Sequence, residues 1–304
     1  MAAGMPGKYD PGSLRILITG KNGQLGWELA RAFSLVGDVF AFDRDALNLA
    51  DPDAIRRCCN DVKPALILNA GAYTAVDRAE QEPELAMQIN AVAPQVFAEE
   101  ANRLGAALVH YSTDYVFSGT ATAPYREEDP TAPQSVYGKT KLAGERAVAE
   151  VADHFLVFRT SWVYAARRQN FLLTMLRLAR EREELRVVAD QIGSPTWVHT
   201  LSELTRAAID TEGRLAIADG VYHASANGRT SWHAFAEAIF ASMPDPHRIA
   251  KRVVPISTAD FPTPAKRPAF SVLSNEKIEF ATKTRVPDWQ DQLAGCIADY
   301  ERSA

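Results

Sequence analysis

Three glycines spaced three residues apart follow a short apolar run near the start of the chain. The run, residues 14–19, is rich in branched side chains and is typical of a strand buried on both faces. Glycines in a turn between a strand and a helix let the backbone approach a pyrophosphate, whose charge is met by the first N–H groups of the helix. A plain turn would need only one glycine. The pattern therefore predicts a nucleotide site, to which we assign Gly20, Gly23, Gln24, Leu25 and Gly26.

The alternation of strand and helix continues along the first half of the chain. Buried-strand patterns occur at residues 38–42, 64–73, 106–113 and 155–159, and helical patterns at residues 27–35, 51–61 and 83–104. This alternation predicts an α/β fold with a doubly wound parallel sheet of the Rossmann type. Within the third helix, Asn90 is polar in an apolar setting, and it is either an exposed helix residue or a buried structural one.

The composition excludes several classes of protein. With 304 residues, of which 47% are hydrophobic, the chain can bury a large core. A net charge of -5 argues against binding nucleic acid or an anionic membrane through bulk charge. No apolar run approaches the roughly 20 residues of a membrane span. Because the cysteines and histidines show neither a disulfide framework nor metal-ligand spacing, we expect no metal site built from them and a cytoplasmic protein.

The strand at residues 38–42 ends at two charged residues that bear on the choice of cofactor. Asp43 lies 23 residues after Gly20, where an acid typically accepts hydrogen bonds from the adenosine ribose hydroxyls. Arg44 follows, and a guanidinium at that point would suit a 2′-phosphate. The two neighbours favour opposite cofactors, so NADH and NADPH both stay open.

Tyr137 and Lys141 are four residues apart, which places them on one face of a helix about one turn from each other. The pKa of a free tyrosine is about 10, and a nearby cation lowers it by favouring the phenolate. Such a pair can pass a proton to a carbonyl oxygen near neutral pH. By itself, this spacing more often marks a surface tyrosine beside a solvated lysine.

Thr113 ends the strand at residues 106–113, and the carboxyl ends of central strands face the crevice in which open α/β sheets bind ligands. Its hydroxyl could hydrogen-bond the same carbonyl oxygen that Tyr137 protonates, or it could satisfy its own turn. A hydroxyl, a phenol and an ammonium occur together by chance less often than any one of them. We therefore predict that Thr113, Tyr137 and Lys141 form a catalytic site.

Eight blocks of sequence together resemble one known family. They are GKNGQLG (residues 20–26), NAGAYTAVDRAE (69–80), YSTDYVFSG (111–119), VYGKTKLAGE (136–145), FRTSWVY (158–164), NFLLTMLRLA (170–179), DQIGSPT (190–196) and KRPAFSVL (266–273). The chain resembles the dTDP-4-dehydrorhamnose reductase family of extended short-chain dehydrogenases/reductases, from residue 14 almost to the end. Two residues depart from the family pattern. Asn48 stands where an acid near the adenine is frequent, and Gly71 stands where alanine is common.

The strand pattern and the resemblance together imply two lobes. Residues 14–165 would form an NAD(P)-binding Rossmann domain, to which residues of about 197–224 return. Residues 166–304 would form mainly a smaller, mixed α/β C-terminal substrate-binding lobe. Residues 1–13 contain glycine and proline and lack an apolar signal-peptide core, so we expect a disordered leader there.

The resemblance implies a reductase that acts on a dTDP-sugar. The reaction would be reduction of the 4-keto group of dTDP-4-dehydro-L-rhamnose by NADPH or NADH, with Tyr137 as the acid and Thr113 orienting the carbonyl. Lys141 would hold the nicotinamide ribose and lower the Tyr137 pKa. The resemblance also assigns Tyr137 and Lys141 to the cofactor, together with the glycine turn, Asp43 and Arg44. Further cofactor contacts would come from Asn48, Leu49, Ala72, Tyr73, Thr74 and Tyr111. Sugar-nucleotide contacts would come from Thr113, Asp114, Tyr137, Trp162, Asn170 and Arg267.

Alternatives stay open beside this assignment. Trp162 would otherwise be a core or lobe-interface aromatic, and Arg267 a solvated basic residue instead of a diphosphate ligand. The chain could also be a nucleotide-sugar epimerase, or a non-catalytic NADP-binding regulatory subunit resembling the methionine adenosyltransferase beta subunit. The resemblance further predicts a homodimer, and some family members carry Mg²⁺ at the dimer interface. Glu28 would contribute there, or it would be an ordinary first-turn acid.

Overall fold

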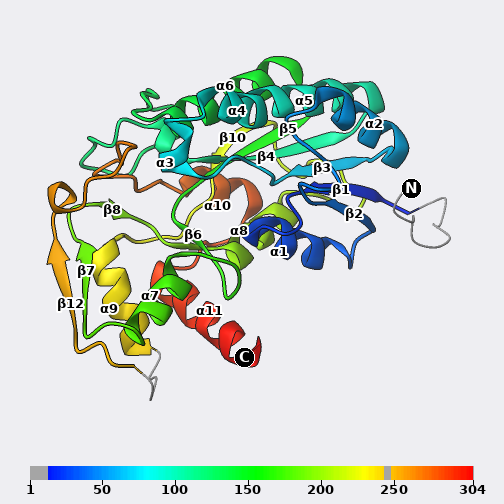
Figure 1. Cartoon of the computed structure of the whole chain (residues 1–304). Helices are drawn as coiled ribbons and strands as arrows, with labels where there is room; N and C mark the ends of the chain where they lie inside the picture. The colour runs from blue at the N-terminus through cyan, green and yellow to red at the C-terminus, as the bar shows by residue number, and fades with distance from the viewer. Residues whose placement is uncertain (1–12, 243–247, 304) are drawn as a thin grey trace.

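A parallel sheet of six strands forms the centre of the molecule, in the order β10-β5-β4-β3-β1-β2 (Figure 1). The computed structural model describes residues 13–242 and 248–303, so the leader predicted for residues 1–13 lies outside the described residues except for Ser13. The strands are β1 (Arg15–Thr19), β2 (Asp38–Phe42), β3 (Leu66–Asn69), β4 (Ala107–Thr113), β5 (Phe155–Thr160) and β10 (Gly220–His223). Every pairing in this sheet is parallel, which confirms the predicted fold class.

Helices cover both faces of the sheet (Figure 1). One face carries α2 (Pro52–Val62), α4 (Pro83–Met87), α5 (Ala93–Leu104) and α6 (Val136–Val151), and the other carries α1 (Gln24–Phe33), α8 (Val198–Ala207) and α10 (Glu276–Thr282). Successive strand residues alternate between the two cores, as a strand requires. Leu17, Ile67 and Leu108 pack against α2 and α5, whereas Leu66 and Leu68 pack against α1 and α8.

Two helix predictions need correction at their ends. The helix predicted from residue 27 begins at Gln24, because the glycine turn itself forms the first turn of α1 and Gly23 is its N-cap. The helix predicted over residues 83–104 contains a π-helical turn, Gln88–Val92, between α4 and α5. This turn holds Asn90, and π-turns often mark functional sites.

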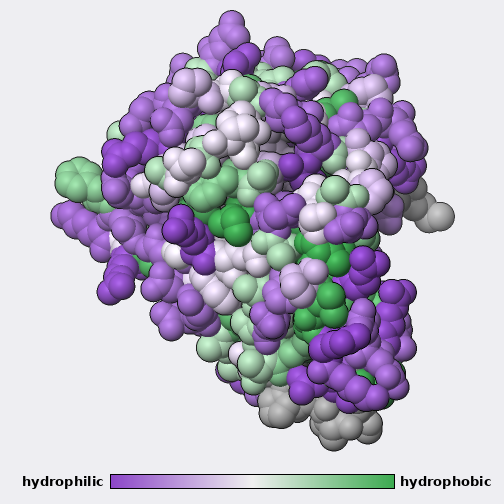
Figure 2. Space-filling view, turned by 90° about the vertical axis from the view of Figure 1, so that its left-hand side faces the viewer, coloured by the Kyte–Doolittle hydropathy of each residue, from purple (hydrophilic) through white to green (hydrophobic). Residues whose placement is uncertain are grey.

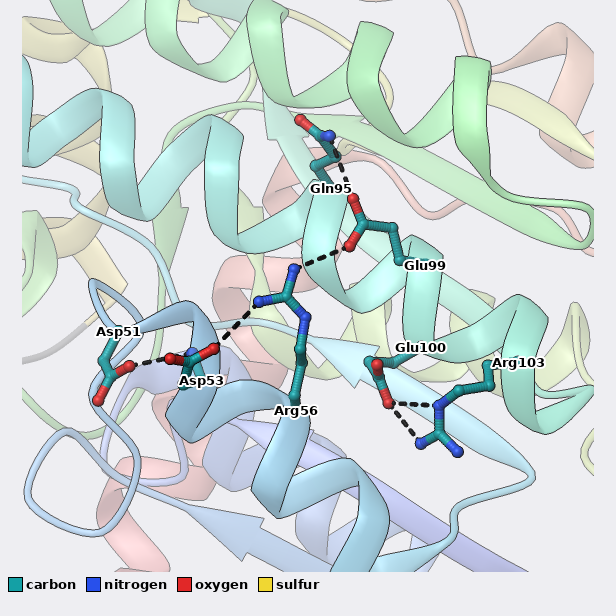
Figure 3. Close-up of polar contacts among 7 residues, drawn as sticks. All are labelled: Asp51, Asp53, Arg56, Gln95, Glu99, Glu100 and Arg103. Carbon is teal, nitrogen blue, oxygen red and sulfur yellow. Dashed lines mark hydrogen bonds and ion pairs between the residues drawn. The ribbon is translucent and has the colours of Figure 1, made fainter.

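The outer edges of α2 and α5 are joined by polar side chains (Figure 3). Asp51 caps α2 by accepting hydrogen bonds from the N–H groups of Asp53 and Ala54. Arg56 on α2 donates to Glu99 on α5, with a nitrogen–oxygen distance of 3.1 Å. Both side chains are substantially exposed, so such a pair contributes little beyond holding the helices in register.

The C-terminal part of the chain builds a second core. The parallel pair β7 (Glu184–Val188) and β12 (Arg252–Ile256) packs with α7 (Phe171–Ala179), α9 (Trp232–Ser242) and α11 (Trp289–Ser303). Short segments of the C-terminal part are β6 (Val163–Tyr164), β8 (Ile192–Gly193), β9 (Thr196–Trp197), β11 (Thr230–Ser231) and the 3-10 turn Thr258–Asp260. Two other short elements, α3 (Val76–Ala79) and the 3-10 turn Asp114–Val116, pack against α6. The predicted loop at residues 190–196 therefore contains two short strands, β8 and the start of β9, which pair with β11 and β6.

The surface of the molecule mixes hydrophilic residues with smaller apolar areas. Figure 2 shows hydrophilic residues around the rim of one face and apolar residues exposed in patches across its middle and lower part. Among the described residues, no helix is long and apolar enough to cross a membrane.

Candidate active site

The glycine turn forms a cradle that no larger residue would leave open. Gly20 has a φ of +73°, which favours glycine, and its carbonyl accepts a 2.8 Å hydrogen bond from the Gly23 N–H. A Cβ at Gly26 would lie 2.2 Å from the Gly20 oxygen, and a Cβ at Gly71 would lie 2.7 Å from Leu49. The start of α1 has no side-chain cap on its N–H groups. This cradle fits the pyrophosphate of a dinucleotide.

Asp43 is held against the glycine turn, as an adenosine-ribose acceptor would be. Its carboxylate accepts a 2.9 Å hydrogen bond from Asn22, and the Lys21 ammonium lies 3.7 Å away. The Ala46 N–H hydrogen bond, helped by Lys21, lowers the pKa of Asp43 below its usual value, so the carboxylate stays ionised. Arg44 and Asn48 lie exposed on the loop that follows β2.

Asn90 holds the loop after β3 in place. It is fully buried, and its amide accepts from the Tyr73 N–H at 2.8 Å and donates to the Tyr73 carbonyl and to Thr140 on α6. The buried structural interpretation of Asn90 is therefore confirmed. The cofactor residues predicted on this loop, Ala72, Tyr73 and Thr74, thus follow β3 on backbone that Asn90 links to α6.

Thr113 and Tyr137 meet at the carboxyl end of β4. Ser135 caps α6 by accepting from the Gly138 N–H, which places Tyr137 in the first turn of the helix. The Thr113 side chain lies close to the phenol, and this contact acts to lower the Tyr137 pKa. Thr113 also donates to Asp114 at 2.9 Å. The structure therefore brings the predicted hydroxyl and phenol together.

The pKa of Tyr137 moves in the direction opposite to the predicted one. Burial raises it above the usual value, and the contact with the Thr113 side chain offsets only part of the rise. Lys141 does not lower it, because the ammonium is turned toward β4: it donates to the Tyr111 carbonyl at 2.6 Å and lies 3.2 Å from His110 Nε2. Burial lowers the pKa of Lys141 to about 8, against the opposing charge of Glu145.

Asp114 lies beside this pair and is almost completely buried. Burial raises the pKa of its carboxyl to about 6, although the hydrogen bond from Thr113 opposes the rise. A buried carboxyl that titrates near pH 6 therefore lies one residue from Thr113.

Trp162 takes its position from two distant residues. Its backbone φ of +47° lies in the left-handed region, which is strained for a large residue. Its indole stacks on that of Trp232, and a Cβ at Gly193 would lie only 2.4 Å from the Trp162 ring. The half-buried indole is thus fixed between α9 and β8.

Three predicted site residues have other contacts in the structure. The Tyr111 side chain points to the opposite core and contacts Thr205 on α8, so only its carbonyl faces Lys141. Asn170 caps α7 and donates to Gln24 and to carbonyls of its own loop, which occupies its amide. Arg267, which the sequence assigns to the sugar nucleotide, forms a 2.7 Å ion pair with Asp77.

The surroundings of Glu28 do not fit a Mg²⁺ ligand. Its carboxylate accepts from the side chains of Arg31 and His199, and both hydrogen bonds lower its pKa despite burial. The Arg31 guanidinium repels a divalent ion, and the Glu28 carboxylate raises the pKa of His199, which favours a second positive charge there. No cluster of three or more His, Cys, Asp and Glu residues suited to a metal exists within residues 13–242 and 248–303.

The sequence interpretation missed three residues that shape the site. Trp232 and Gly193 fix Trp162, and His110 contacts Lys141. Residue spacing does not show which strands become neighbours, so these contacts could not be predicted. The one signal in the sequence was His110, a histidine in an otherwise apolar stretch of β4.

Comparison with known proteins agrees with this geometry. A family model described as RmlD substrate binding domain matches residues 14–302. A dTDP-4-dehydrorhamnose reductase of Burkholderia thailandensis is 48% identical, over 94% of this chain and 99% of the relative. The Escherichia coli K12 reductase is 43% identical, over 91% and 95% of the two chains. The crystal structure of the Bacillus anthracis reductase in complex with NADP has a TM-score of 0.88 at 36% identity, covering 94% of this chain and 99% of that one. The chain therefore belongs to the RmlD substrate binding domain family.

Proposed function

We propose that this chain is a dTDP-4-dehydrorhamnose reductase, which reduces the 4-keto group of dTDP-4-dehydro-L-rhamnose to give dTDP-L-rhamnose. The observation that carries the proposal is the close approach of the Tyr137 phenol to the Thr113 side chain, one helix turn from Lys141 and on the same sheet edge as the glycine cradle. Relatives that bear this name match nearly the whole chain. When bound, the nicotinamide nucleotide supplies hydride to C4 of the sugar.

Tyr137 donates the proton that the reduced C4 oxygen needs. A reduction requires the phenol in its protonated form, and the raised pKa keeps it protonated throughout the neutral range. Thr113 orients the substrate carbonyl toward the phenol, because its side chain lies beside that of Tyr137. Asp114 fixes the Thr113 hydroxyl from the other side and contacts the sugar.

Lys141 holds the ribose of the nicotinamide, and the rest of the cofactor lies along the glycine cradle. The helix start at Gly23 receives the pyrophosphate, and Asp43 accepts from the adenosine ribose. The exposed Arg44 and the NADP bound by the Bacillus anthracis relative support NADPH as the preferred reductant. NADH stays the alternative because of Asp43.

Trp162 contacts the deoxysugar from the C-terminal lobe. Its indole is half-buried, so part of the ring is free to cover an apolar face of the sugar. The division of labour proposed here gives the dinucleotide to the central sheet and the sugar to residues 166–304 together with Trp162.

The test is incubation with enzymatically made dTDP-4-dehydro-L-rhamnose, following the absorbance of NADPH and of NADH in separate reactions. We expect net oxidation of the cofactor and formation of dTDP-L-rhamnose. The Tyr137→Phe variant should lose turnover by at least about a hundredfold and bind the cofactor nearly as before. Turnover that persists in this variant would remove Tyr137 from the role of acid.

The same assay separates the two rival functions. An epimerase would convert a sugar nucleotide without net consumption of NADPH or NADH. A regulatory subunit would show no turnover and would be recovered in a stoichiometric complex with a partner enzyme. The intact sequence of residues 158–164 favours the reductase over both.

Location and assembly are proposed on narrower grounds. Cys58, Cys59 and Cys296 all carry free thiols, which supports a reducing compartment such as the cytoplasm. The resemblance supports a homodimer, and light scattering of the purified chain tests it.

A further inference from the structure

Three polar residues lie side by side across the middle of the apolar sheet. Thr19 on β1 is paired in register with Asn69 on β3, and Asn69 is paired with His110 on β4. All three are at most 1% exposed. The residues two positions earlier on these strands, Leu17, Ile67 and Leu108, lie in the apolar core beneath α2 and α5. Polar residues in such a row are unfavourable unless each one is hydrogen-bonded.

The row is hydrogen-bonded from end to end and connects two parts of the site. Thr19 accepts from the Gly71 N–H at 2.7 Å, and its hydroxyl lies 2.8 Å from the Asn69 amide. The other end of the Asn69 amide lies 3.1 Å from His110 Nδ1, and His110 Nε2 lies 3.2 Å from the Lys141 ammonium. The row therefore runs from the glycine cradle, where Thr19 precedes Gly20, to the catalytic lysine.

His110 meets Lys141 as a neutral imidazole. Burial, together with the charge of Lys141, holds the pKa of His110 well below its usual value. An ammonium has only donors, so Nε2 accepts from Lys141 and the ring proton lies on Nδ1. Nδ1–H therefore needs an acceptor, so the Asn69 amide turns its oxygen to His110 and its nitrogen to the Thr19 hydroxyl. Nε2 and the Tyr111 carbonyl then occupy two of the three N–H bonds of Lys141. Two fixed acceptors prevent the ammonium from rotating, so the direction of its third N–H is fixed as well.

We propose that His110 is a positioning residue, which aims the third N–H of Lys141 at the nicotinamide ribose and is itself held by Asn69 and Thr19. This inference rests on the proposed function only in taking Lys141 as the ribose ligand. Without Nε2, the ammonium would keep one acceptor and could rotate about the Tyr111 hydrogen bond. The expected consequence is weaker cofactor binding, independent of which sugar is reduced.

Two amide variants of one residue separate positioning from simple loss of packing. In His110→Gln the amide oxygen can take the place of Nε2, whereas in His110→Asn the shorter amide reaches only Asn69. We expect the dissociation constant of NADP⁺, measured by calorimetry, to rise about tenfold in His110→Asn and to stay within about threefold of the parent in His110→Gln. Equal weakening in both variants would contradict positioning.

A matched control measures the general effect of losing a buried hydrogen bond to β4. Thr205 on α8 contacts the Tyr111 hydroxyl on the opposite side of the sheet. Thr205→Val should lower the unfolding temperature without changing the dissociation constant of NADP⁺. If this variant weakens binding as much as His110→Asn, the effect is one of stability and the inference is wrong.

A double-mutant cycle with Lys141→Met shows whether His110 acts through the lysine. In the Lys141→Met background, His110→Asn should produce no further weakening of NADP⁺ binding. Additive effects would place His110 outside this pathway, while leaving the reductase assignment intact.

If the parent chain bound neither NADP⁺ nor NAD⁺, the proposed function and this inference would fail together. If the parent binds NADP⁺ and reduces the sugar nucleotide, and His110→Asn binds NADP⁺ equally well, only the inference about His110 is wrong and the proposed function stands.

Discussion

The indole of Trp232 lies flat on the indole of Trp162, with ring centroids 3.6 Å apart and planes inclined by 5°. Trp162 is the aromatic proposed to contact the sugar, and Trp232 comes from α9, seventy residues later in the sequence. Phe171 packs against Trp232, with the two ring centroids 4.6 Å apart. The sugar-facing ring is therefore part of a preformed aromatic stack.

Trp232→Leu should loosen Trp162 and weaken binding of the sugar nucleotide. A stacked aromatic pair contributes about 0.5–1.5 kcal/mol beyond its buried area, so we expect KM for the sugar nucleotide to rise roughly two- to tenfold. The dissociation constant of NADPH should not change. Phe280→Ala is the control, because Phe280 is an exposed aromatic on α10. An unchanged KM in Trp232→Leu would show that Trp162 does not depend on the stack.

Gly193→Ala should displace Trp162 directly. The new Cβ would lie 2.4 Å from the indole, and overpacking of this kind costs about 1–3 kcal/mol. We expect both a lower unfolding temperature and a KM for the sugar nucleotide raised about tenfold. Gly105→Ala provides the comparison, because its Cβ would meet nothing within 4 Å while its φ of +66° still strains the backbone. That variant should lose stability alone.

Asp114→Asn should change stability in a way that depends on pH. The folded-state pKa of about 6 lies above the value near 3.9 of an unfolded chain. Below about pH 4 the Asp114 carboxyl is protonated in both states, and the parent has its full free energy of unfolding. As pH rises through about 6 the buried carboxyl ionises, and this part of the parent's stability is lost. Asparagine stays neutral, so the variant should gain about 3 kcal/mol relative to the parent between these two pH values.

Urea unfolding of parent and Asp114→Asn at several pH values between 4 and 7 measures this difference. The exposed Asp153 gives the matched control, because Asp153→Asn removes a solvated carboxylate. A stability difference for Asp114→Asn that is the same at every pH would contradict the raised pKa.

Cofactor affinity should fall at alkaline pH because of Lys141. The pKa of its ammonium is about 8 in the structure, and the protonated form makes the stronger hydrogen bond to the ribose. The dissociation constant of NADP⁺ should therefore rise roughly three- to tenfold as pH goes from about 7 to 9. Lys141→Met should bind weakly at every pH and lack this dependence. A parent affinity that is flat over this range would show that Lys141 does not titrate there, or does not bind the ribose.

The sequence by itself determined the parts of the protein that follow from local patterns. Branched apolar runs between helices predicted the parallel sheet, and the spacing of Gly20, Gly23 and Gly26 predicted the cradle. The helical pattern at residues 51–61 predicted α2 to within a residue at each end. These features depend on side chains within a few residues of each other, so periodicity and turn chemistry are enough to reveal them.

Tertiary structure decided which groups meet and what burial does to them. The Tyr137 pKa rises because packing removes water from the phenol, an effect that helix spacing does not contain. Arg267 pairs with Asp77, and His110 contacts Asn69 and Lys141. These contacts exist only because the strand order and the paths of the loops bring distant segments together. Register across β1, β3 and β4 turns three separate polar residues into one row. Contacts between distant segments are set by the packing of the whole sheet, and no single segment of sequence specifies them.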